Sequence, residues 1–283
     1  MTTSTNRPAG PDANEAYTLG SNPAETARLR SSQPEALRPE SAALLDRIGL
    51  APGDSALDLG CGPHGVLDLL HAAVMPGGRV VGLDADPTHA AMARQYAAES
   101  GLGGVEVLAA DARHTRLPSA TFDLVHARTL LVNIPEAAEV VTEMARLAKP
   151  GGWVASLDVD LEYSLCYPPL AEWDRLHELV LAVYSQTGAD YSIGRRLTEM
   201  YRDAGLEQTG VQSHAPAYPV DHARRTIIPD LVRSMRPRIL QSGLASEDEL
   251  DDLDRAVRAH LNDPRMVVIP CLLIGAWGRK PLS

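Results

Sequence analysis

The sequence predicts a doubly wound α/β domain over residues 49–160, and three observations lead to this prediction. Short apolar runs alternate regularly with amphipathic stretches, a glycine-rich turn follows the first run, and a Pro-Gly-Gly turn precedes the fifth. Regular alternation with short loops requires right-handed crossovers and therefore a parallel sheet. The expected strands are 56–59, 80–84, 105–109, 122–127 and 153–158, and three helices ending near residues 74, 100 and 148 lie between them.

The residues before this domain are expected to form a tail and a lid. Residues 1–14 are polar and rich in Pro, Gly and Asn, so we expect them to be disordered. Residues 15–48 predict an N-terminal helical lid. Its first helix starts at Asn22-Pro23, an N-cap followed by a proline in the first helical position, and its second helix ends at Gly49.

The residues after position 160 are expected to cover and complete the sheet. Helical periodicity over 161–204 and 221–262 predicts a helical roof above the carboxyl edge of the strands, with the second stretch broken at Pro229 and Pro237. Residues 205–220 and 263–283 are expected to add strands to the core. The second of these segments contains one long apolar strand over 266–277.

Composition excludes several classes of partner. The formal net charge is −11 and the sequence has no block of Lys or Arg, so neither nucleic acid nor an anionic membrane is expected to bind. The apolar runs are too short to span a bilayer, and the N-terminus lacks the apolar core of a signal peptide. The three cysteines are far apart and lack metal-ligand spacing. We therefore expect a soluble cytoplasmic protein with reduced thiols.

A glycine-rich turn followed by an acid predicts a nucleotide-like ligand. Gly60, Gly62 and Gly65 follow the first strand, and glycine lets a backbone approach a ligand closely. Asp84 ends the next strand, 24 residues after Gly60, which is close to the spacing at which nucleotide folds place a carboxylate on a ribose diol. The glycine spacing alone also fits a nicotinamide dinucleotide enzyme.

Five motifs together resemble the class I S-adenosylmethionine-dependent methyltransferases, in particular the small-molecule branch that includes menaquinone and ubiquinone biosynthesis. The motifs are Asp58-Leu59-Gly60-Cys61-Gly62, Gly82-Leu83-Asp84-Ala85-Asp86, Ala109-Ala110-Asp111-Ala112, Thr121-Phe122-Asp123-Leu124-Val125, and the Lys149-Pro150-Gly151-Gly152 turn. They occur in the family's order and argue against the dinucleotide alternative. The resemblance implies a Rossmann-like, mostly parallel seven-stranded sheet whose last strand is antiparallel, a place that residues 266–277 fit.

The resemblance also implies a cofactor site for S-adenosylmethionine. Gly60, Cys61 and Gly62 are expected to hold the amino-acid end, Asp84 and Ala85 the ribose, and Asp111 and Ala112 the adenine. Arg128 is expected near the methionine carboxylate, and Tyr17 is expected to cover the cofactor from the lid. His64 departs from the family pattern, because related sequences usually carry glycine at this position.

Catalytic candidates follow the fourth and fifth strands. Asp158 closes the fifth strand, and His126 ends the fourth, at the edge where α/β folds place their active crevice. Either could act as a general base if the acceptor must lose a proton. Asp160 and Glu162 alternate with Asp158 on one face of the chain. Oxygen-ligand metal sites usually draw on several segments, so we expect no metal here.

These features predict a methyltransferase that acts on a small-molecule acceptor, such as a natural product or other secondary metabolite. Net charge and the acids after the fifth strand favour a neutral or cationic acceptor. The sequence leaves open whether oxygen, nitrogen or carbon receives the methyl group, and the aromatic roof helices could pair in a homodimer. Two alternatives are a protein that keeps the cofactor structurally while catalysing another reaction, such as a cyclisation, and a cofactor-sensing module without chemistry.

Overall fold

A computed structural model describes residues 17–19, 22–32 and 36–282. The predicted disordered tail at 1–14 lies outside the described residues. No helix within the described residues is long and apolar enough to cross a membrane.

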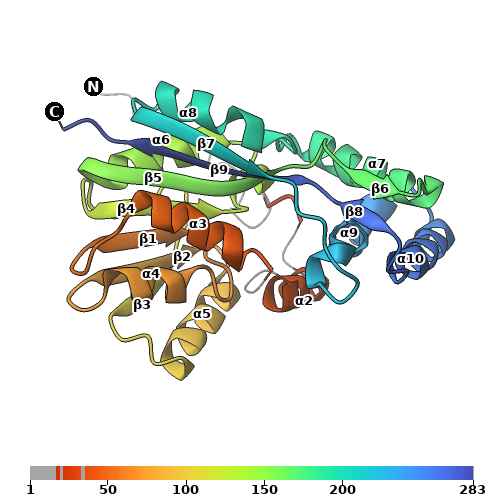
Figure 1. The fold of residues 1–283 in the computed structure, drawn as a ribbon, viewed down its shortest axis with the longest axis horizontal. Coiled ribbons are helices and arrows are strands. Elements are labelled where there is room, and N and C mark those ends of the chain that lie inside the picture. The colour runs from red at the N-terminus through yellow and green to blue at the C-terminus, as the bar shows by residue number, and fades with distance from the viewer. Residues whose placement is uncertain (1–16, 20–21, 33–35, 283) are drawn as a thin grey trace, which may run out of the picture.

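The centre of the protein is a seven-stranded sheet in the order β3-β2-β1-β4-β5-β9-β7 (Figure 1). The first five strands in chain order pair in parallel, and β9 runs antiparallel to both of its neighbours. Strand order reverses between β1 and β4, which is where open α/β sheets bind ligands. The predicted fold class is therefore confirmed. The strands are β1 Ser55–Leu59, β2 Arg79–Asp84, β3 Val105–Ala109, β4 Phe122–Arg128, β5 Ala148–Asp160, β7 Glu207–His214 and β9 Leu272–Arg279.

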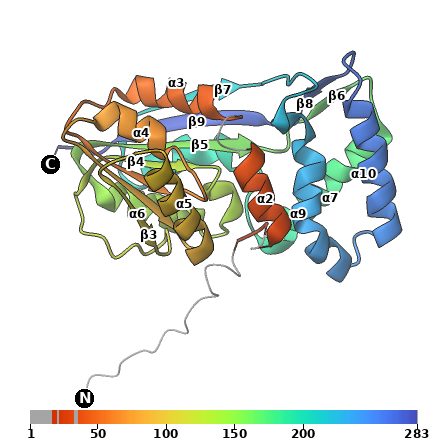
Figure 2. The same cartoon turned by 90° about the horizontal axis from the view of Figure 1, so that it is seen from below.

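Helices cover both faces of this sheet (Figure 2). One face carries α3 (Arg38–Ile48), α4 (Leu67–Val74) and α5 (Pro87–Glu99), and the other carries α6 (Ala137–Leu147) and α8 (Leu197–Asp203). The apolar side chains of α6 recur at helical spacing and are buried, namely Val140, Val141, Met144 and Leu147. Burial of such stripes on both faces makes the sheet the core of the molecule.

A second group of helices lies beyond the carboxyl ends of the parallel strands. It consists of α2 (Pro23–Ser32), α7 (Ala171–Thr187), α9 (Ile227–Gln241) and α10 (Glu247–Leu261), and α9 packs against each of the other three. Figure 2 shows α2 between the sheet and α9. The backbone N–H of Glu25 donates to Oδ1 of Asn22, as expected for the predicted N-cap.

The roof differs from the prediction in two respects. The helix α8 and the 3-10 helix η2 (Ile193–Arg196) pack against β9, so this part of 161–204 belongs to the sheet domain instead of the roof. Pro229 and Pro237 lie inside one continuous helix, α9. Pro229 lies in the first turn of α9, where backbone N–H groups have no partner within the helix, so the missing N–H of proline costs no hydrogen bond. Pro237 lies in the interior of the same helix.

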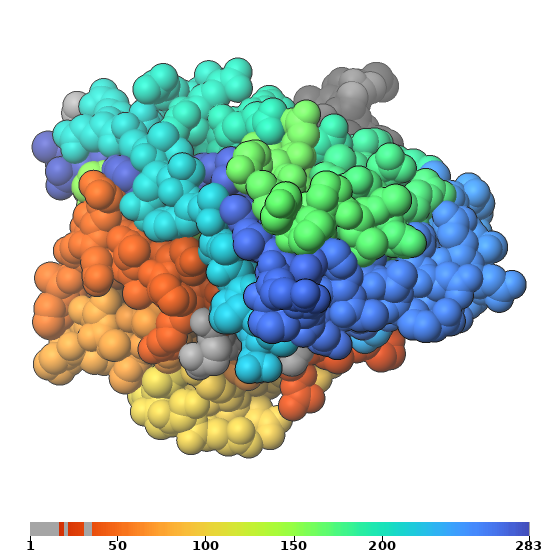
Figure 3. All heavy atoms as spheres, turned by 45° about the vertical axis from the view of Figure 1, so that its right-hand side comes forward, coloured from red at the N-terminus to blue at the C-terminus, as the bar shows by residue number. Residues whose placement is uncertain are grey.

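The predicted apolar strand over 266–277 is also divided. Pro270 supplies no N–H, and the chain forms β8 (Val267–Ile269) before it and β9 after it. The first piece pairs with β6 (Leu165–Tyr167), which we had expected to begin a helix, in a separate two-stranded sheet. In Figure 3 the cyan loop after β7 runs down between α3 (orange) and the dark blue segment that contains β8.

Candidate functional site

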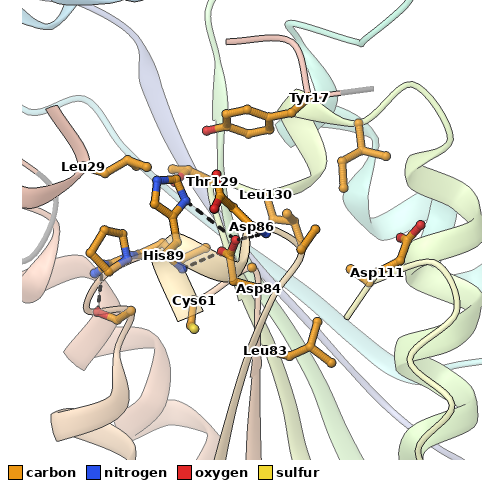
Figure 4. Close-up of a pocket in the computed structure, with 18 of the residues that line it drawn as sticks. Tyr17, Leu29, Cys61, Leu83, Asp84, Asp86, His89, Asp111, Thr129 and Leu130 are labelled. Atoms are coloured by element: carbon orange, nitrogen blue, oxygen red, sulfur yellow. Dashed lines mark hydrogen bonds and ion pairs between the residues drawn. The ribbon is translucent and has the colours of Figure 1, made fainter. Parts of the chain in front are cut away.

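A cleft of about 910 Å³, including its part open to solvent, lies at the carboxyl ends of β1, β2, β3 and β4. The cleft is lined by every residue predicted to contact the cofactor, namely Tyr17, Gly60, Cys61, Gly62, Asp84, Ala85, Asp111, Ala112 and Arg128. His64 lines it as well. The fold thus brings together, at one place, residues from the lid and from four strands (Figure 4).

The turn after β1 depends on its glycines for two different reasons. Gly60, Gly62 and Gly65 all have positive φ, between 57° and 66°. A Cβ at Gly60 would lie 2.5 Å from a methyl carbon of Leu130, and one at Gly65 would lie 2.3 Å from Oδ2 of Asp58. A Cβ at Gly62 would meet nothing within 4 Å. At Gly60 and Gly65 the absence of a side chain therefore allows close packing within the turn. At Gly62 it leaves the backbone exposed to the cleft.

Asp84 connects this turn to the end of β2. Its Oδ2 accepts a hydrogen bond from the N–H of Gly62 at 2.8 Å, and its Oδ1 accepts one from the N–H of Asp86 at 2.9 Å. Each carboxylate oxygen has a second lone pair available. The carboxylate is therefore held in place, with acceptor capacity left for a ligand in the cleft.

His89, which the sequence analysis did not single out, links Asp84 to the helix α2. Its Nδ1 lies 3.7 Å from Oδ1 of Asp84, and its Nε2 lies 3.3 Å from the hydroxyl of Thr26. Burial acts to lower the pKa of His89, but the Asp84 carboxylate outweighs burial and raises it. A single histidine in an amphipathic helix carries no sequence signal for this role.

Asp111 is held by an arginine that also lines the cleft. The Arg113 guanidinium donates to both carboxylate oxygens of Asp111, with Nη2 at 2.8 Å from Oδ2, and its Nη1 donates to Glu136 at 3.0 Å. Burial acts to raise the pKa of Asp111, but the hydrogen bonds from Arg113 outweigh it and the pKa is lowered. Asp111 is therefore ionised and available as an acceptor.

Tyr17 lies at the top of the cleft in Figure 4 and is fixed by a buried ion pair of the lid. Its hydroxyl donates to Oε1 of Glu25 at 3.0 Å, and Nε of Arg28 donates to Oε2 of the same carboxylate at 2.7 Å. Burial and the Glu25 charge raise the pKa of Tyr17 well above its usual value. The phenol therefore stays protonated, which suits a covering side chain and excludes a base.

Arg128 closes the cleft at the end nearest the glycine turn. Its Nη2 donates to the carbonyl of Gly65 at 2.9 Å, and its Nη1 donates to the hydroxyl of Ser41 at 3.3 Å. Among the described residues it forms no ion pair. Burial lowers the pKa of Arg128, and the charge of Arg224 lowers it further against the opposite effect of Asp58. Its positive charge is thus available to an anionic group.

Asp158 and His126, the predicted catalytic residues, do not line the cleft. Both side chains are fully buried. Asp158 accepts hydrogen bonds from the N–H groups of Leu131 at 2.9 Å and Val159 at 3.0 Å, and burial raises its pKa to about 7. We correct the prediction on this geometry: Asp158 anchors the chain after β4 and has no surface with which to touch an acceptor.

His126 has a comparable internal contact. Its Nδ1 lies 2.8 Å from Oδ1 of Asp58, whose other oxygen accepts a hydrogen bond from the N–H of Val66. His126 therefore contacts Asp58, which in turn holds the chain after the glycine turn. This buried position differs from the catalytic position that we had predicted. A strand residue near the carboxyl end can point into a packed layer as well as into the crevice, and sequence position alone does not separate the two.

The acids beyond β5 are neutralised by one arginine. The Arg195 guanidinium lies 2.6 Å from Asp160 and 2.7 Å from Glu162. Within the described part of the chain, no group of three or more His, Cys, Asp or Glu side chains could hold a metal ion. The observed arrangement is therefore an ion-pair network.

Comparison with known proteins identifies the domain that carries this cleft. Residues 57–156 match the family model described as a methyltransferase domain. This part of the chain is a methyltransferase domain. The match begins within β1 and ends within β5, so it contains the glycine turn, Asp84 and Asp111. The class that the five motifs indicated is confirmed.

Three proteins illustrate what this chain is similar to in sequence or in structure. The chain is 38% identical over 140 residues to nocamycin O-methyltransferase of Saccharothrix syringae, covering 49% of this chain and 48% of that protein. It is 29% identical over 182 residues to a Geobacillus demethylmenaquinone methyltransferase, covering 60% and 78%. Among solved structures, the [4+2]-cyclase SpnF has a TM-score of 0.55 at 20% identity, covering 90% and 84%. The chain thus spans about half the length of its nocamycin relative.

Proposed function

We propose that this protein is an S-adenosylmethionine-dependent methyltransferase that transfers a methyl group to an oxygen, nitrogen or carbon of a small-molecule acceptor. The observation that carries the proposal is the Asp84 carboxylate, held by the N–H of Gly62 at the topological switch point of the sheet. A fixed carboxylate beside an open backbone matches what a ribose diol requires.

The residues of the cleft fit the cofactor from end to end. Gly62 presents open backbone, Asp84 has free lone pairs for hydroxyl donors, and Asp111 is ionised for an amine donor. Arg128 supplies a buried positive charge for the carboxylate of the amino-acid end. Bound there, S-adenosylmethionine supplies a methyl group activated by a sulfonium. Tyr17 then covers the site and restricts water.

The contribution of this chain to catalysis is mainly placement. Correct orientation of two reacting groups corresponds to effective molarities of about 10⁵ M or more. The two buried candidates, Asp158 and His126, do not reach the cleft, so no general base from β4 or β5 is required in the proposal. In this proposal, α2 and the chain after β7 enclose the acceptor and hold its reacting atom in line with the methyl group of the cofactor.

Relatives support a small acceptor. The nocamycin enzyme is named for O-methylation of a small molecule, and we extend that class to this chain, including a role in secondary metabolism. We also propose that the protein is cytoplasmic, as expected from its sequence. A homodimer is part of the same proposal. Charge selection for the acceptor depends on residues outside the part of the cleft that holds the cofactor.

One alternative is favoured by a specific observation. SpnF, a cyclase by name, shares the fold of this chain. A protein of this fold can therefore carry out a reaction other than methylation. In that alternative the cofactor is a structural element of the cleft, and its methyl group stays in place.

Two measurements separate these possibilities. Calorimetry with S-adenosylmethionine and S-adenosylhomocysteine tests the site, with NADH as the competing ligand class. Incubation with methyl-labelled cofactor and an acceptor panel tests transfer. Binding with transfer supports the methyltransferase, whereas binding with persistent absence of transfer favours the alternative. Binding of NADH in place of both adenosyl compounds contradicts the proposed site.

A further inference from the structure

Two neighbouring arginines of the 3-10 helix η3 (Ala223–Thr226) are equally buried and differ in their partners. Arg224 and Arg225 are each 3% exposed. Arg225 donates to four backbone carbonyls, those of Tyr218, Leu261 (2.6 Å), Asp263 (3.1 Å) and Met266 (2.8 Å). Its role is therefore to join the loop after β7 to the end of α10 and the connection that leads to β8.

Arg224 has no comparable set of contacts. Among the described residues its guanidinium donates one long hydrogen bond, to the sulfur of Cys271 at 3.9 Å, and its Nε has no hydrogen-bond partner. The guanidinium also lies near the hydroxyl of Tyr218. Among the described residues it forms no ion pair. A buried charge without a partner is costly in free energy. Such a group in a folded protein calls for an explanation, and a missing ligand is one of the few available.

Two further polar atoms without partners lie beside Arg224. The hydroxyl of Tyr218 and Oε2 of Glu40 are both buried and unpaired. Tyr218 stacks on His222 with ring centroids 4.3 Å apart, and Nδ1 of His222 accepts a hydrogen bond from the N–H of Arg224. Burial raises the pKa of Tyr218, the charge of Arg224 and its interaction with the hydroxyl lower it, and Cys271 and Glu40 raise it, so all three side chains lie near the phenol. We name Glu40, Tyr218 and Arg224 the Arg224 cluster.

The Arg224 cluster adjoins the cofactor cleft at Arg128. Ser41, which follows Glu40 in α3, accepts the hydrogen bond from Arg128 at 3.3 Å. The Arg224 charge is close enough to lower the pKa of Arg128, with burial as the larger cause. The helix η3 also packs against α2, the helix that covers the cleft. Figure 3 shows the cyan segment that precedes and includes η3 running down beside α3.

We propose that the Arg224 cluster is the subsite that binds the acceptor, and that the acceptor carries an anionic oxygen such as a carboxylate or an acidic enol. This inference rests on the proposed methyltransferase function. Arg224 supplies a planar fork of donors that matches a carboxylate, and burial strengthens that pairing. Tyr218 and Glu40 hydrogen-bond to neutral polar groups of the same molecule.

The local charge explains why this inference departs from the sequence prediction of a neutral or cationic acceptor. That prediction used net charge and the acids after β5. Asp158 is buried against backbone amides, and Asp160 and Glu162 are paired with Arg195. Arg128 has Asp58 and Asp68 near it, but within the Arg224 cluster Glu40 is the one carboxylate, and Arg224 forms no ion pair with it or with any other described residue, so its charge is left for an anionic group.

The test compares a carboxylate with its neutral isostere on the full-length protein loaded with S-adenosylhomocysteine. The probes are 4-phenylbutyrate and 4-phenylbutanamide, with dissociation constants measured by ligand-observed NMR. We expect the wild type to bind the carboxylate about tenfold more tightly than the amide, as for one charge-assisted hydrogen-bond pair. Arg224→Gln should abolish this preference, and Arg224→Lys should retain part of it. Arg255→Gln, on the exposed face of α10 (Glu247–Leu261), is the matched control and should leave the preference unchanged.

Three results overturn the inference. They are equal binding of acid and amide by the wild type, no binding of the carboxylate at millimolar concentration, and a carboxylate preference that survives Arg224→Gln. A tenfold loss of S-adenosylhomocysteine affinity in Arg224→Gln would assign Arg224 to the cofactor and also overturn it. If the wild type binds no S-adenosylhomocysteine, the proposed function fails separately, and the same fragment comparison is then made on the free protein. Thermal unfolding of each variant verifies that it is folded.

Discussion

The N–H of Gly62 donates a 2.8 Å hydrogen bond to Oδ2 of Asp84, so the turn after β1 is tied to the acid that ends β2. A ligand that hydrogen-bonds to Asp84 therefore also meets the open backbone of Gly62. This relationship underlies the first two predictions.

Replacement of Asp84 by asparagine should weaken S-adenosylhomocysteine binding by about 1.5–3 kcal/mol. The variant loses the charge that strengthens hydrogen bonds from a diol, and such bonds to charged groups contribute about that much. Calorimetry measures the change. Asp252→Asn, whose side chain is exposed on α10, is the control and should bind as the wild type does. Unchanged affinity in Asp84→Asn would remove Asp84 from the site.

Alanine at Gly62 and at Gly65 should have different effects. Gly65→Ala places a methyl group 2.3 Å from Oδ2 of Asp58 at positive φ, so we expect a loss of folding stability of about 1–3 kcal/mol. Gly62→Ala meets open space, so its stability loss should be limited to about 1 kcal/mol of backbone strain. Urea denaturation measures both. Because the added methyl group projects toward the cleft, Gly62→Ala should also lose cofactor affinity, and equal stabilities with unchanged binding would contradict this division.

Methionine at Arg224 and at Arg225 should shift stability in opposite directions. Arg224→Met removes a buried charge that has no carboxylate partner, and such replacements are often neutral or stabilising by about 1–4 kcal/mol. Arg225→Met leaves four backbone carbonyls without their donor and should destabilise by about 3 kcal/mol or more. Denaturant unfolding of the two variants at one pH is sufficient. Strong destabilisation by Arg224→Met would show that Arg224 has a structural role.

Asp158 should make folding stability fall as pH rises. Burial raises its pKa to about 7 in the folded protein, and an unfolded aspartate titrates near pH 4. Between these values the folded state binds more protons than the unfolded state, so the free energy of unfolding decreases with pH and levels off above about pH 7. The contribution is on the order of 4 kcal/mol.

The measurement for this prediction is urea unfolding of the wild type and Asp158→Asn from pH 4 to pH 8. Asparagine keeps an acceptor for the N–H of Leu131 but does not titrate in this range. The difference in stability between the two proteins should decline toward pH 7 and then stay constant. A difference that is independent of pH would show that Asp158 is already ionised in the folded protein.

The sequence could predict which residues meet in the cleft where we propose that the cofactor binds, because local segments build it. Gly62, Asp84 and Asp111 each follow a strand, and the carboxyl ends of parallel strands meet at one edge. The residue type and its position at the end of a strand were therefore enough to predict that these side chains lie in one cleft. His89 escaped prediction because its partner Thr26 belongs to the lid, and nothing local couples the two.

The remaining features depend on long-range packing. Asp158 and His126 end their strands as expected, but which side of the sheet edge receives each side chain depends on the layer packed against it. Pro270 divides the predicted strand, and the first piece pairs with β6, a long-range contact that the local sequence does not indicate. Arg224 and Arg225 are adjacent and chemically identical, and only the folded loops distinguish the satisfied guanidinium from the unsatisfied one.

The contrast between these two halves has an evolutionary consequence. The residues after the strands that we propose to bind the adenosyl group lie within one continuous stretch, whereas the Arg224 cluster is contributed by the start of α3, the loop after β7 and η3. Substitutions within residues 215–226 could thus change which acceptor binds while the residues proposed to bind the cofactor stay the same. A chimera carrying that segment from a relative should inherit the relative's choice of molecule.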